Sequence, residues 1–243
     1  IPDSVISIGD SAFSSCSELT SIAIPKSVAN IGEYAFEACV DLTEINVAAD
    51  NAAYCSENGV LYDKEKTEII RFPNNNKKYT TAFTIPTGVT SIANGAFERC
   101  WNLTSIEIPD GVTHIGDYAF NGCYYEEKDE DDNIISRLGL TSIEIPDGVV
   151  SIGNHAFDGC SGITSMEIPE SVARIGNSAF SSCVSLTGIS VSEGNASYCA
   201  ENGVLYNKAK TKIIRFPCQK TDTSFMIPNG ITSIADGAFE NCR

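Results

Sequence analysis

Cysteine is the residue type in this 243-residue sequence whose number and spacing first suggest chemistry. Ten cysteines are present, and seven share one position, three residues after the Phe of an Ala-Phe pair: Cys16, Cys39, Cys100, Cys123, Cys160, Cys183 and Cys242. No Cys-x-x-Cys pair occurs, which argues against a metal site. Because free cysteine is among the most buried residue types, we favour a column of packed thiols. Disulfides between neighbouring repeats are the alternative.

Histidines and nucleophile motifs give little support for catalysis. The two histidines, His114 and His155, stand at different repeat positions and neither has a motif partner. Gly-x-Ser-x-Gly, His-Glu-x-x-His and phosphate-binding glycine loops are all missing from the sequence. Acid pairs are frequent, but in so acidic a chain they are weak evidence for a glycosidase-like pair. We therefore expect no enzymatic activity and no cofactor.

Net charge and hydropathy exclude several classes of partner. The 16 Lys and Arg residues against 32 Asp and Glu residues give a net charge of −16. This argues against nucleic acid and anionic lipid, whose phosphates need a basic surface. No apolar run approaches the roughly 18 residues of a membrane span, so we expect no direct membrane insertion.

A repeat organises the chain and positions the cysteines. An Ile-Pro pair precedes each Ala-Phe unit, and adjoining units are 23 residues apart, as between Pro86 and Pro109. Within one unit, Leu103–Ile108 alternates in polarity and predicts a strand, followed by a turn at Pro109. We expect Asp117 to cap a single helical turn that carries Phe120 and Cys123.

One unit cannot bury its own apolar face, but stacked units can, because Ile then falls on Ile and Phe on Phe. Stacking also pairs each strand with its neighbours at about 4.8 Å per repeat. The sequence therefore predicts a β-rich α/β solenoid. We expect its parallel β-sheet on the concave face, with short helical turns and extended pieces on the convex side.

A longer repeat is superposed on the first. Residues 50–73 and 194–217 align at an offset of 144, with 18 of 24 identical. Each segment predicts two strands, the first pair at 60–62 and 69–72, and we treat 48–84 and 192–226 as hairpin-like inserts that continue the stack. Cys218 stands where the other copy has Asn74, and is the best candidate for a reactive thiol.

The unit Leu-x-x-Ile-x-Ile-Pro-x-x-Val-x-x-Ile-Gly-x-x-Ala-Phe-x-x-Cys resembles the leucine-rich repeat of BspA-like surface proteins, also called the Treponema pallidum type. The two inserts resemble segments common in such proteins from gut bacteria. The resemblance implies a curved leucine-rich repeat solenoid and a bacterial surface or secreted location. It also implies attachment to host matrix proteins, other bacteria or epithelium.

A stripe of outward side chains on the predicted strands is the first candidate binding surface. It consists of Ser105, Glu107, Ser142, Glu144, Ser165 and Glu167. Like charges stacked at strand spacing repel one another, so the stripe is either fully solvated or faces a cationic partner. We expect it on the concave face.

An insertion of 14 residues between Cys123 and Leu140 is the second candidate surface. We expect an acidic loop over 124–137, beginning with Tyr124, Tyr125, Glu126 and Glu127. Such insertions map to loops on one face of a solenoid, often the functional one. A solvated loop without function is the alternative.

The sequence as a whole predicts one solenoid over 1–243, an uncapped piece of a longer chain whose signal and anchor lie outside it. We expect a non-catalytic, extracellular binding module for a host matrix or surface protein. A structural stalk and a glycan-binding module are the alternatives. The exposed strand edges at the two ends also predict weak end-to-end self-association.

Overall fold

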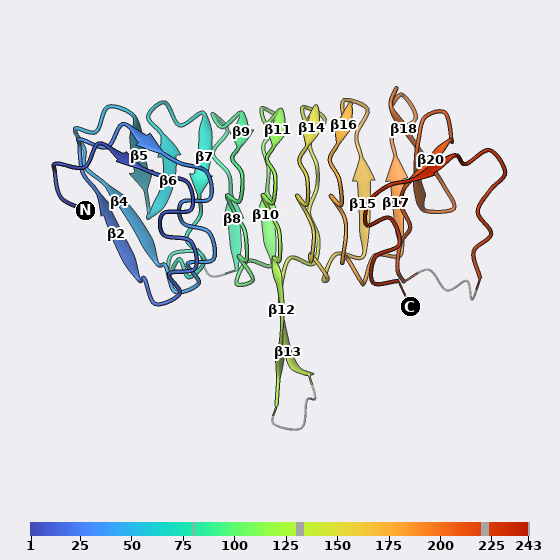
Figure 1. Cartoon of the computed structure of the whole chain (residues 1–243), viewed down its shortest axis with the longest axis horizontal. Helices are drawn as coiled ribbons and strands as arrows, with labels where there is room; N and C mark the ends of the chain where they lie inside the picture. The colour runs from blue at the N-terminus through green and yellow to red at the C-terminus, as the bar shows by residue number, and fades with distance from the viewer. Residues whose placement is uncertain (80, 130–133, 220–223, 243) are drawn as a thin grey trace.

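The computed structural model describes residues 1–79, 81–129, 134–219 and 224–242. Figure 1 shows a row of rungs stacked along the long axis, with the two chain ends in opposite end regions. The described residues form strands and turns and contain no helix.

The strands of the first half are β1 (Ser7–Ile8), β2 (Ser21–Ile24), β3 (Asn30–Ile31), β4 (Glu44–Val47), β5 (Tyr54–Glu57), β6 (Val60–Asp63), β7 (Glu68–Arg71), β8 (Ala82–Thr84), β9 (Ser91–Ile92), β10 (Ser105–Glu107) and β11 (His114–Ile115). Those of the second half are β12 (Tyr124–Lys128), β13 (Ile134–Gly139), β14 (Ser151–Ile152), β15 (Ser165–Ile168), β16 (Arg174–Ile175), β17 (Gly188–Val191), β18 (Tyr198–Glu201), β19 (Val204–Asn207), β20 (Lys212–Arg215) and β21 (Ser233–Ile234).

Each regular rung contributes extended segments to two columns. In the first column, β2 pairs with β4, β8 with β10 and β15 with β17, all parallel. The second column is a seven-stranded sheet in the order β16-β14-β11-β9-β7-β6-β5, parallel from β16 to β7. His114 pairs with Ser91 on one side and Ser151 on the other, so equivalent repeat positions lie side by side.

The segment after the second column is not the helical turn that the sequence predicts. Tyr118 has a positive φ of 56°, which interrupts a right-handed helix. The backbone N–H groups of Tyr118 and Phe120 donate instead to Asn154 O (2.8 Å) and Ala156 O (2.7 Å) of the next rung. These lateral bonds take the donors that a helix would use internally, so the segment forms successive turns.

The core beneath these turns is built from ladders of identical side chains. Phe97, Phe120 and Phe157 stack with ring centroids 5.2 Å apart at each step. Beside them, the Cys123 thiol donates to Phe97 O at 2.9 Å and the Cys160 thiol to Phe120 O at 3.0 Å. All ten cysteines are free thiols, so the column is packed thiols and not disulfides.

The duplicated segments 50–73 and 194–217 each contain three strands where the sequence predicts two. The additional strands are β5 and β18, which pair antiparallel with β6 and β19. The last strand of each duplicated segment, β7 or β20, pairs parallel with β9 or β21 of the following rung. The missed strands have the sequences Tyr-Cys-Ser-Glu and Tyr-Cys-Ala-Glu. Neither alternates between apolar and polar residues, so the sequence pattern does not indicate a strand.

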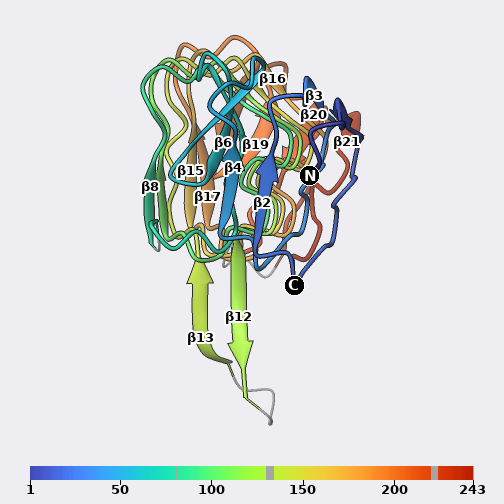
Figure 2. The same ribbon diagram turned by 90° about the vertical axis from the view of Figure 1, so that its left-hand side faces the viewer.

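The acidic insertion forms a hairpin where the sequence predicts a loop. β12 and β13 pair antiparallel, from Tyr124 opposite Gly139 to Lys128 opposite Ile134. The hairpin projects from one edge of the solenoid (Figures 1 and 2). The residues 130–133 of the predicted loop lie outside the described residues.

Candidate functional site

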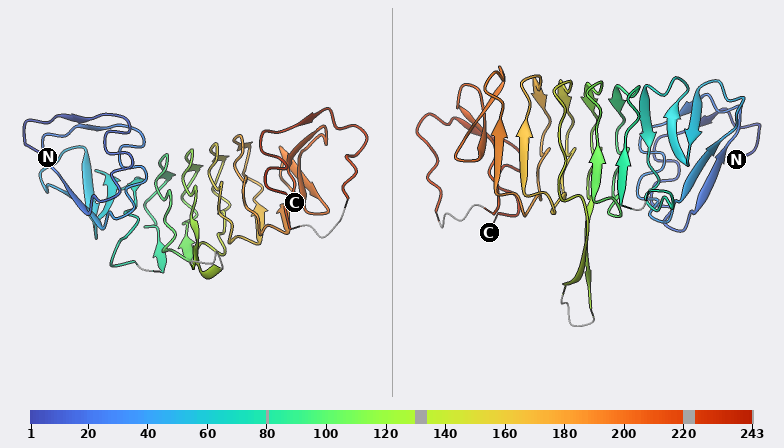
Figure 3. Two further views of the ribbon diagram at one scale, coloured as in Figure 1. Left: turned by 60° about the horizontal axis from the view of Figure 1, so that its bottom comes forward. Right: turned by 180° about the vertical axis from the view of Figure 1, so that it is seen from behind.

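The solenoid is curved, and its hollow side is the candidate site. In Figure 3 (left) both end regions rise above the middle rungs, and Figure 2 shows both termini on the same side of the molecule. A hollow of about 830 Å³ lies on this side. It is lined by the second strand column and the turns that follow it, from Tyr34 in the second rung to Arg174 on β16.

The floor of the hollow is a row of outward side chains on the seven-stranded sheet. In register across the strands, these are Glu68, Ser91, His114, Ser151 and Arg174. Ser91 Oγ donates to Glu68 Oε1 at 3.3 Å, and burial raises the pKa of the Glu68 carboxyl. The floor therefore changes from acidic at β7 to basic at β16.

One wall of the hollow is a ladder of Asn and Asp side chains. Asn94 Oδ1 accepts the backbone N–H of Asp117 at 2.8 Å, and Asp117 Oδ1 accepts that of Asn154 at 2.7 Å. Asn154 Oδ1 accepts the N–H of Asn177 at 2.8 Å. The predicted helix-capping role of Asp117 is therefore wrong, because its carboxylate joins two rungs.

An aromatic ridge follows this ladder. Tyr118 and His155 stack with nearly parallel rings 4.8 Å apart, and Tyr34 lies edge-on to Tyr118 at 6.0 Å between ring centroids. Two rungs separate Tyr34 from Tyr118: the insert rung of Phe72 and the rung of Phe97. The latter carries Gly95 at the position of the tyrosines, where a Cβ would lie only 3.3 Å from Tyr34 Cδ1. The missing side chain at Gly95 thus lets the Tyr34 ring approach the Tyr118 ring.

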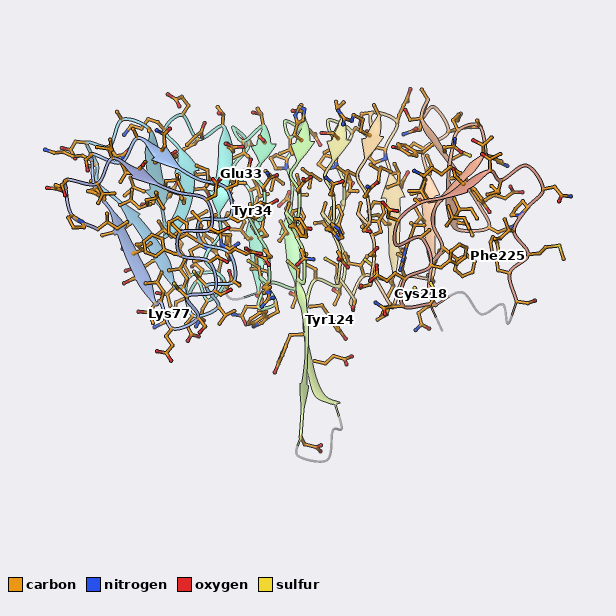
Figure 4. All side chains as sticks on the ribbon, viewed as in Figure 1. Glu33, Tyr34, Lys77, Tyr124, Cys218 and Phe225 are labelled. Atoms are coloured by element: carbon orange, nitrogen blue, oxygen red, sulfur yellow. The ribbon has the colours of Figure 1, made fainter. Side chains whose placement is uncertain are left out.

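Carboxylates surround the start of this ridge. Burial raises the pKa of Tyr34 to about 12, and the charges of Asp117, Glu33 and Glu37 add to the effect. Figure 4 shows Glu33 and Tyr34 side by side on the body of the solenoid. A negative potential at the Tyr34 hydroxyl therefore accompanies the exposed aromatic surface.

Sequence reasoning missed the ridge, although a signal for it exists. Tyr34, Tyr118 and His155 share the repeat position before Ala-Phe, where other rungs carry Ser or Gly. This position has a positive φ throughout, between 53° and 65°. Three aromatic residues at a position that favours Gly or Asn are unusual, so aligning the repeats with one another is enough to reveal them.

The predicted stripe is exposed, but it does not line the hollow. Its members Ser105, Glu107, Ser142, Glu144, Ser165 and Glu167 are all exposed. Ser105 and Glu107 lie on β10 and Ser165 and Glu167 on β15, two strands of the first column, whereas Ser142 and Glu144 lie in a segment that forms no strand. The hollow is lined by the second column instead. None of the six residues is among those that line the hollow, so the stripe is a surface separate from the hollow, and its binding role stays a prediction.

The hairpin brings one predicted residue, Tyr125, to an aromatic neighbour. Tyr125 is 48% exposed, and its ring centroid lies 5.7 Å from that of Trp101. Tyr124, at the root of the hairpin in Figure 4, donates its hydroxyl to Glu126 Oε1 at 3.2 Å. The side chain of Glu127 lies outside the described part of the structure.

A metal site and a membrane-spanning helix are both missing from the described residues. These residues contain no group of three or more His, Cys, Asp or Glu side chains placed to hold a metal ion. No helix of the described chain is long and apolar enough to cross a membrane.

Comparison with known proteins agrees with this architecture. A family model described as the BspA type leucine rich repeat region (6 copies) matches residues 1–83, 75–137, 131–223 and 216–243. The chain belongs to the BspA type leucine-rich repeat family. Among curated proteins, none matches it by sequence.

Solved structures share the fold of this BspA type chain. A leucine-rich repeat protein from Eubacterium ventriosum is 26% identical, with a TM-score of 0.67 over 99% of this chain and 63% of its own. The pneumococcal vaccine antigen PcpA is 21% identical, with a TM-score of 0.64 over 89% of this chain and 51% of its own. The chain thus spans between half and two thirds of these two structures.

Proposed function

We propose that this chain is a non-catalytic module that binds a protein partner at the bacterial cell surface and serves adhesion. The observation that carries the proposal is the hollow, an extended surface to which successive rungs each contribute outward side chains. The Phe and Cys ladders beneath hold that surface in place, and a solenoid presents such a surface for recognition. Membership of a repeat family of interaction modules supports the same function.

The stripe and the hairpin are further proposed contact surfaces. Glu107, Glu144 and Glu167 present three exposed carboxylates outside the hollow. Tyr125 and Trp101 present an aromatic pair at the root of the hairpin. We propose that a host matrix or bacterial surface protein contacts one or both, in addition to the hollow.

A capture experiment tests the proposed function. The immobilised chain is exposed to purified matrix proteins, mucins and bacterial cell surfaces at two salt concentrations, with and without Ca²⁺. We expect salt-sensitive binding to at least one protein, because the chain carries a net charge of −16. Failure to bind any protein contradicts the proposal and favours a structural stalk.

A glycan-binding module makes a different prediction in the same experiment. Free oligosaccharides would then compete with mucins for the chain, while protein ligands without sugars would not bind. Deleting 124–137 and replacing Glu107, Glu144 and Glu167 by Gln, in separate variants, then shows which surface takes part. Unchanged affinity in either variant removes that surface from the proposal.

A further inference from the structure

We propose that the hollow binds an extended polypeptide segment rich in Arg and Lys, with one cationic side chain held against the Tyr34–Tyr118 ridge. The proposal rests on the proposed function, because it names the partner chemistry of the same module. Four features of the hollow support it: its aromatic surface, its charge, the arrangement of its carboxylates and its length.

The aromatic surface is the feature that selects a side chain. Tyr118 stacks one side on His155, yet 37% of the residue stays exposed. Exposed Tyr rings attract ammonium and guanidinium groups within about 6 Å of the ring centroid. A partly exposed tyrosine pair beside a hollow is therefore suited to a Lys or Arg side chain.

The charge of the lining decides between cationic and anionic ligands. Its acidic members are Glu33, Glu37, Asp63, Glu68 and Asp117, and its basic members other than histidine are Arg71 and Arg174. Arg71 is only 3% exposed, and its guanidinium donates inward to Gly95 O and Asn74 Oδ1. Arg174 thus remains as the exposed guanidinium against five carboxylates.

The carboxylates are placed where a cation on the ridge would need them. Asp117, Glu33 and Glu37 all act on the Tyr34 hydroxyl strongly enough to raise the pKa of Tyr34 further than burial alone. The Asp117 carboxylate is fixed by two hydrogen bonds from Asn154, at 2.7 Å and 3.0 Å, so it is held in place before any ligand arrives. A fixed carboxylate loses little freedom when a guanidinium binds.

The length of the hollow indicates an extended segment. Its lining runs from the second rung across β7, β9, β11 and β14 to β16. At about 4.8 Å per strand, this distance accommodates several residues of an extended chain, whose same-side residues repeat about every 6.6 Å. When one cationic side chain of the peptide contacts the ridge, the next cationic side chains along the peptide can therefore reach Glu68.

The repeat itself supplies variants that should fold. Ser11 and Ser178 occupy the ridge position in other rungs with φ of 54° and 53°, so Tyr34→Ser and Tyr118→Ser keep a natural residue there. Asn occupies the position of Asp117 in neighbouring rungs, so Asp117→Asn keeps the acceptor for Asn154 N–H. Glu33 stands at the same repeat position as Asp117, so Glu33→Asn likewise introduces a residue that other rungs carry there.

The probe is a fluorescein-labelled peptide of alternating Arg and Gly, with a citrulline peptide of the same length as its neutral counterpart. Anisotropy titrations at low and physiological salt give Kd for each variant. We expect Tyr34→Ser/Tyr118→Ser to weaken binding by at least about fivefold, the value of roughly 1 kcal/mol of cation–π attraction. Glu33→Asn/Asp117→Asn should weaken it similarly, and the citrulline peptide should not bind.

The matched control removes the same charge outside the hollow and outside the proposed contact surfaces. Asp110→Asn/Asp147→Asn should leave Kd within about twofold, because both residues are exposed, neither lines the hollow, and exposed charges beyond a Debye length of roughly 8 Å are screened at physiological salt. An equal loss in this control would show attraction to net charge alone and overturn the proposal. Competition by chitotetraose or N-acetyllactosamine would overturn it in favour of a glycan site.

Failure of this proposal differs from failure of the proposed function. If the Arg-Gly peptide does not bind while a protein of the capture panel does, the hollow has another ligand and the module function stands. If the ridge variants bind that captured protein unchanged, the ridge is not its contact. If neither peptide nor protein binds, both proposals fail.

Discussion

The insert of the first half and the insert of the second half bury the same polar groups in different surroundings. Asn51 donates to Pro25 O and Val28 O and accepts the N–H groups of Ala53 and Tyr54. Asn195 makes the equivalent four bonds in the other copy, with almost the same distances. Both asparagines are at most 1% exposed, so each satisfies four backbone groups that water cannot reach.

The arginine of each Ile-Ile-Arg-Phe-Pro segment has a second shared role. An insert rung places Phe72 three residues after Ile69, whereas the next rung places Phe97 five residues after Ile92. The insert is therefore too short to form the outer turn, and Arg71 fills the space with its guanidinium bonded to Gly95 O. Arg215 does the same, donating to Gly237 O at 2.6 Å.

The two copies differ in the glutamate that lies beside the arginine. Glu98 is 4% exposed, and burial raises the pKa of its carboxyl while Arg71 lowers it. The equivalent Glu240 is exposed. The same local sequence thus holds a buried carboxylate near its arginine in one copy and a solvated glutamate in the other.

The largest expected difference comes from removing each arginine. We expect Arg71→Met to lower the free energy of unfolding by about 3–5 kcal/mol, because the buried Glu98 carboxylate then keeps only the half-exposed Arg99, at 3.6 Å, as a cationic partner. Arg215→Met should cost only about 1–2 kcal/mol, because Glu240 is solvated and the loss is mainly of hydrogen bonds. Urea denaturation of both variants measures the difference, and equal losses would contradict this account.

Replacing the buried asparagine should destabilise the two copies of the insert about equally. We expect Asn51→Ala and Asn195→Ala each to lower the free energy of unfolding by about 3 kcal/mol, because two carbonyls and two N–H groups lose their partner in each copy. Tyr54→Phe and Tyr198→Phe, which each remove one hydroxyl acceptor from a backbone N–H at 2.8 Å, serve as matched smaller changes of about 1 kcal/mol. Denaturation midpoints that differ strongly between copies would show that these sites are not equivalent.

The stack and its ladders were predictable from sequence because identical residues at a 23-residue period must lie on one another. Ile106 is inward and Ser105 and Glu107 are outward, as the alternation indicates. The Cys column was predictable for the same reason. The family resemblance is also confirmed, and it extends over the whole chain.

Two features were out of reach of pattern reasoning. The turn with Tyr118 follows helix-like spacing, and only the lateral bonds to the next rung, with a positive φ, exclude a helix. The side of the hollow depends on the small rotation between successive rungs, which no single repeat encodes. The ridge was predictable in principle from one position of the aligned repeats, but its partners, such as Gly95, matter only once the rungs are stacked.

A smaller change tests the buried glutamate itself. Because burial raises the folded pKa of Glu98 above its ordinary value of 4.5, the folded state binds more protons than the unfolded state above that pH. Stability therefore falls as pH rises through the folded pKa. Glu98→Gln should reduce but not abolish this fall, because burial also raises the pKa of Glu68, and should raise the free energy of unfolding at pH 7 by no more than about 2 kcal/mol, since Gln keeps an acceptor.

The pH series has its own control in the second copy. Glu240→Gln should leave the pH dependence of unfolding unchanged, because that side chain is exposed. Denaturation of both variants between pH 4 and pH 8 separates the cases. A pH dependence of unfolding that is the same in Glu98→Gln as in the wild type, or an equal effect of both variants, would show that burial of the Glu98 carboxylate does not destabilise the fold.

The smallest expected change in stability comes from the residue three positions after each arginine, which is Asn74 in one copy and Cys218 in the other. Asn74 accepts from Arg71 Nη2 and donates to Glu98 O at 3.1 Å and Arg99 O at 3.2 Å. Cys218 accepts from Arg215 Nη2 at 3.0 Å and contacts Glu240 O at 3.3 Å, but sulfur is a weak donor and a weak acceptor.

Replacing each of these residues by the other should therefore change the free energy of unfolding in opposite directions. We expect Asn74→Cys to destabilise and Cys218→Asn to stabilise, each by about 0.5–1 kcal/mol, the net value of a hydrogen bond. Paired denaturation curves of the two single variants and the double exchange measure this. If both single variants destabilise, each residue is fitted to its own copy, and the two inserts differ in shape at this point as well as in charge.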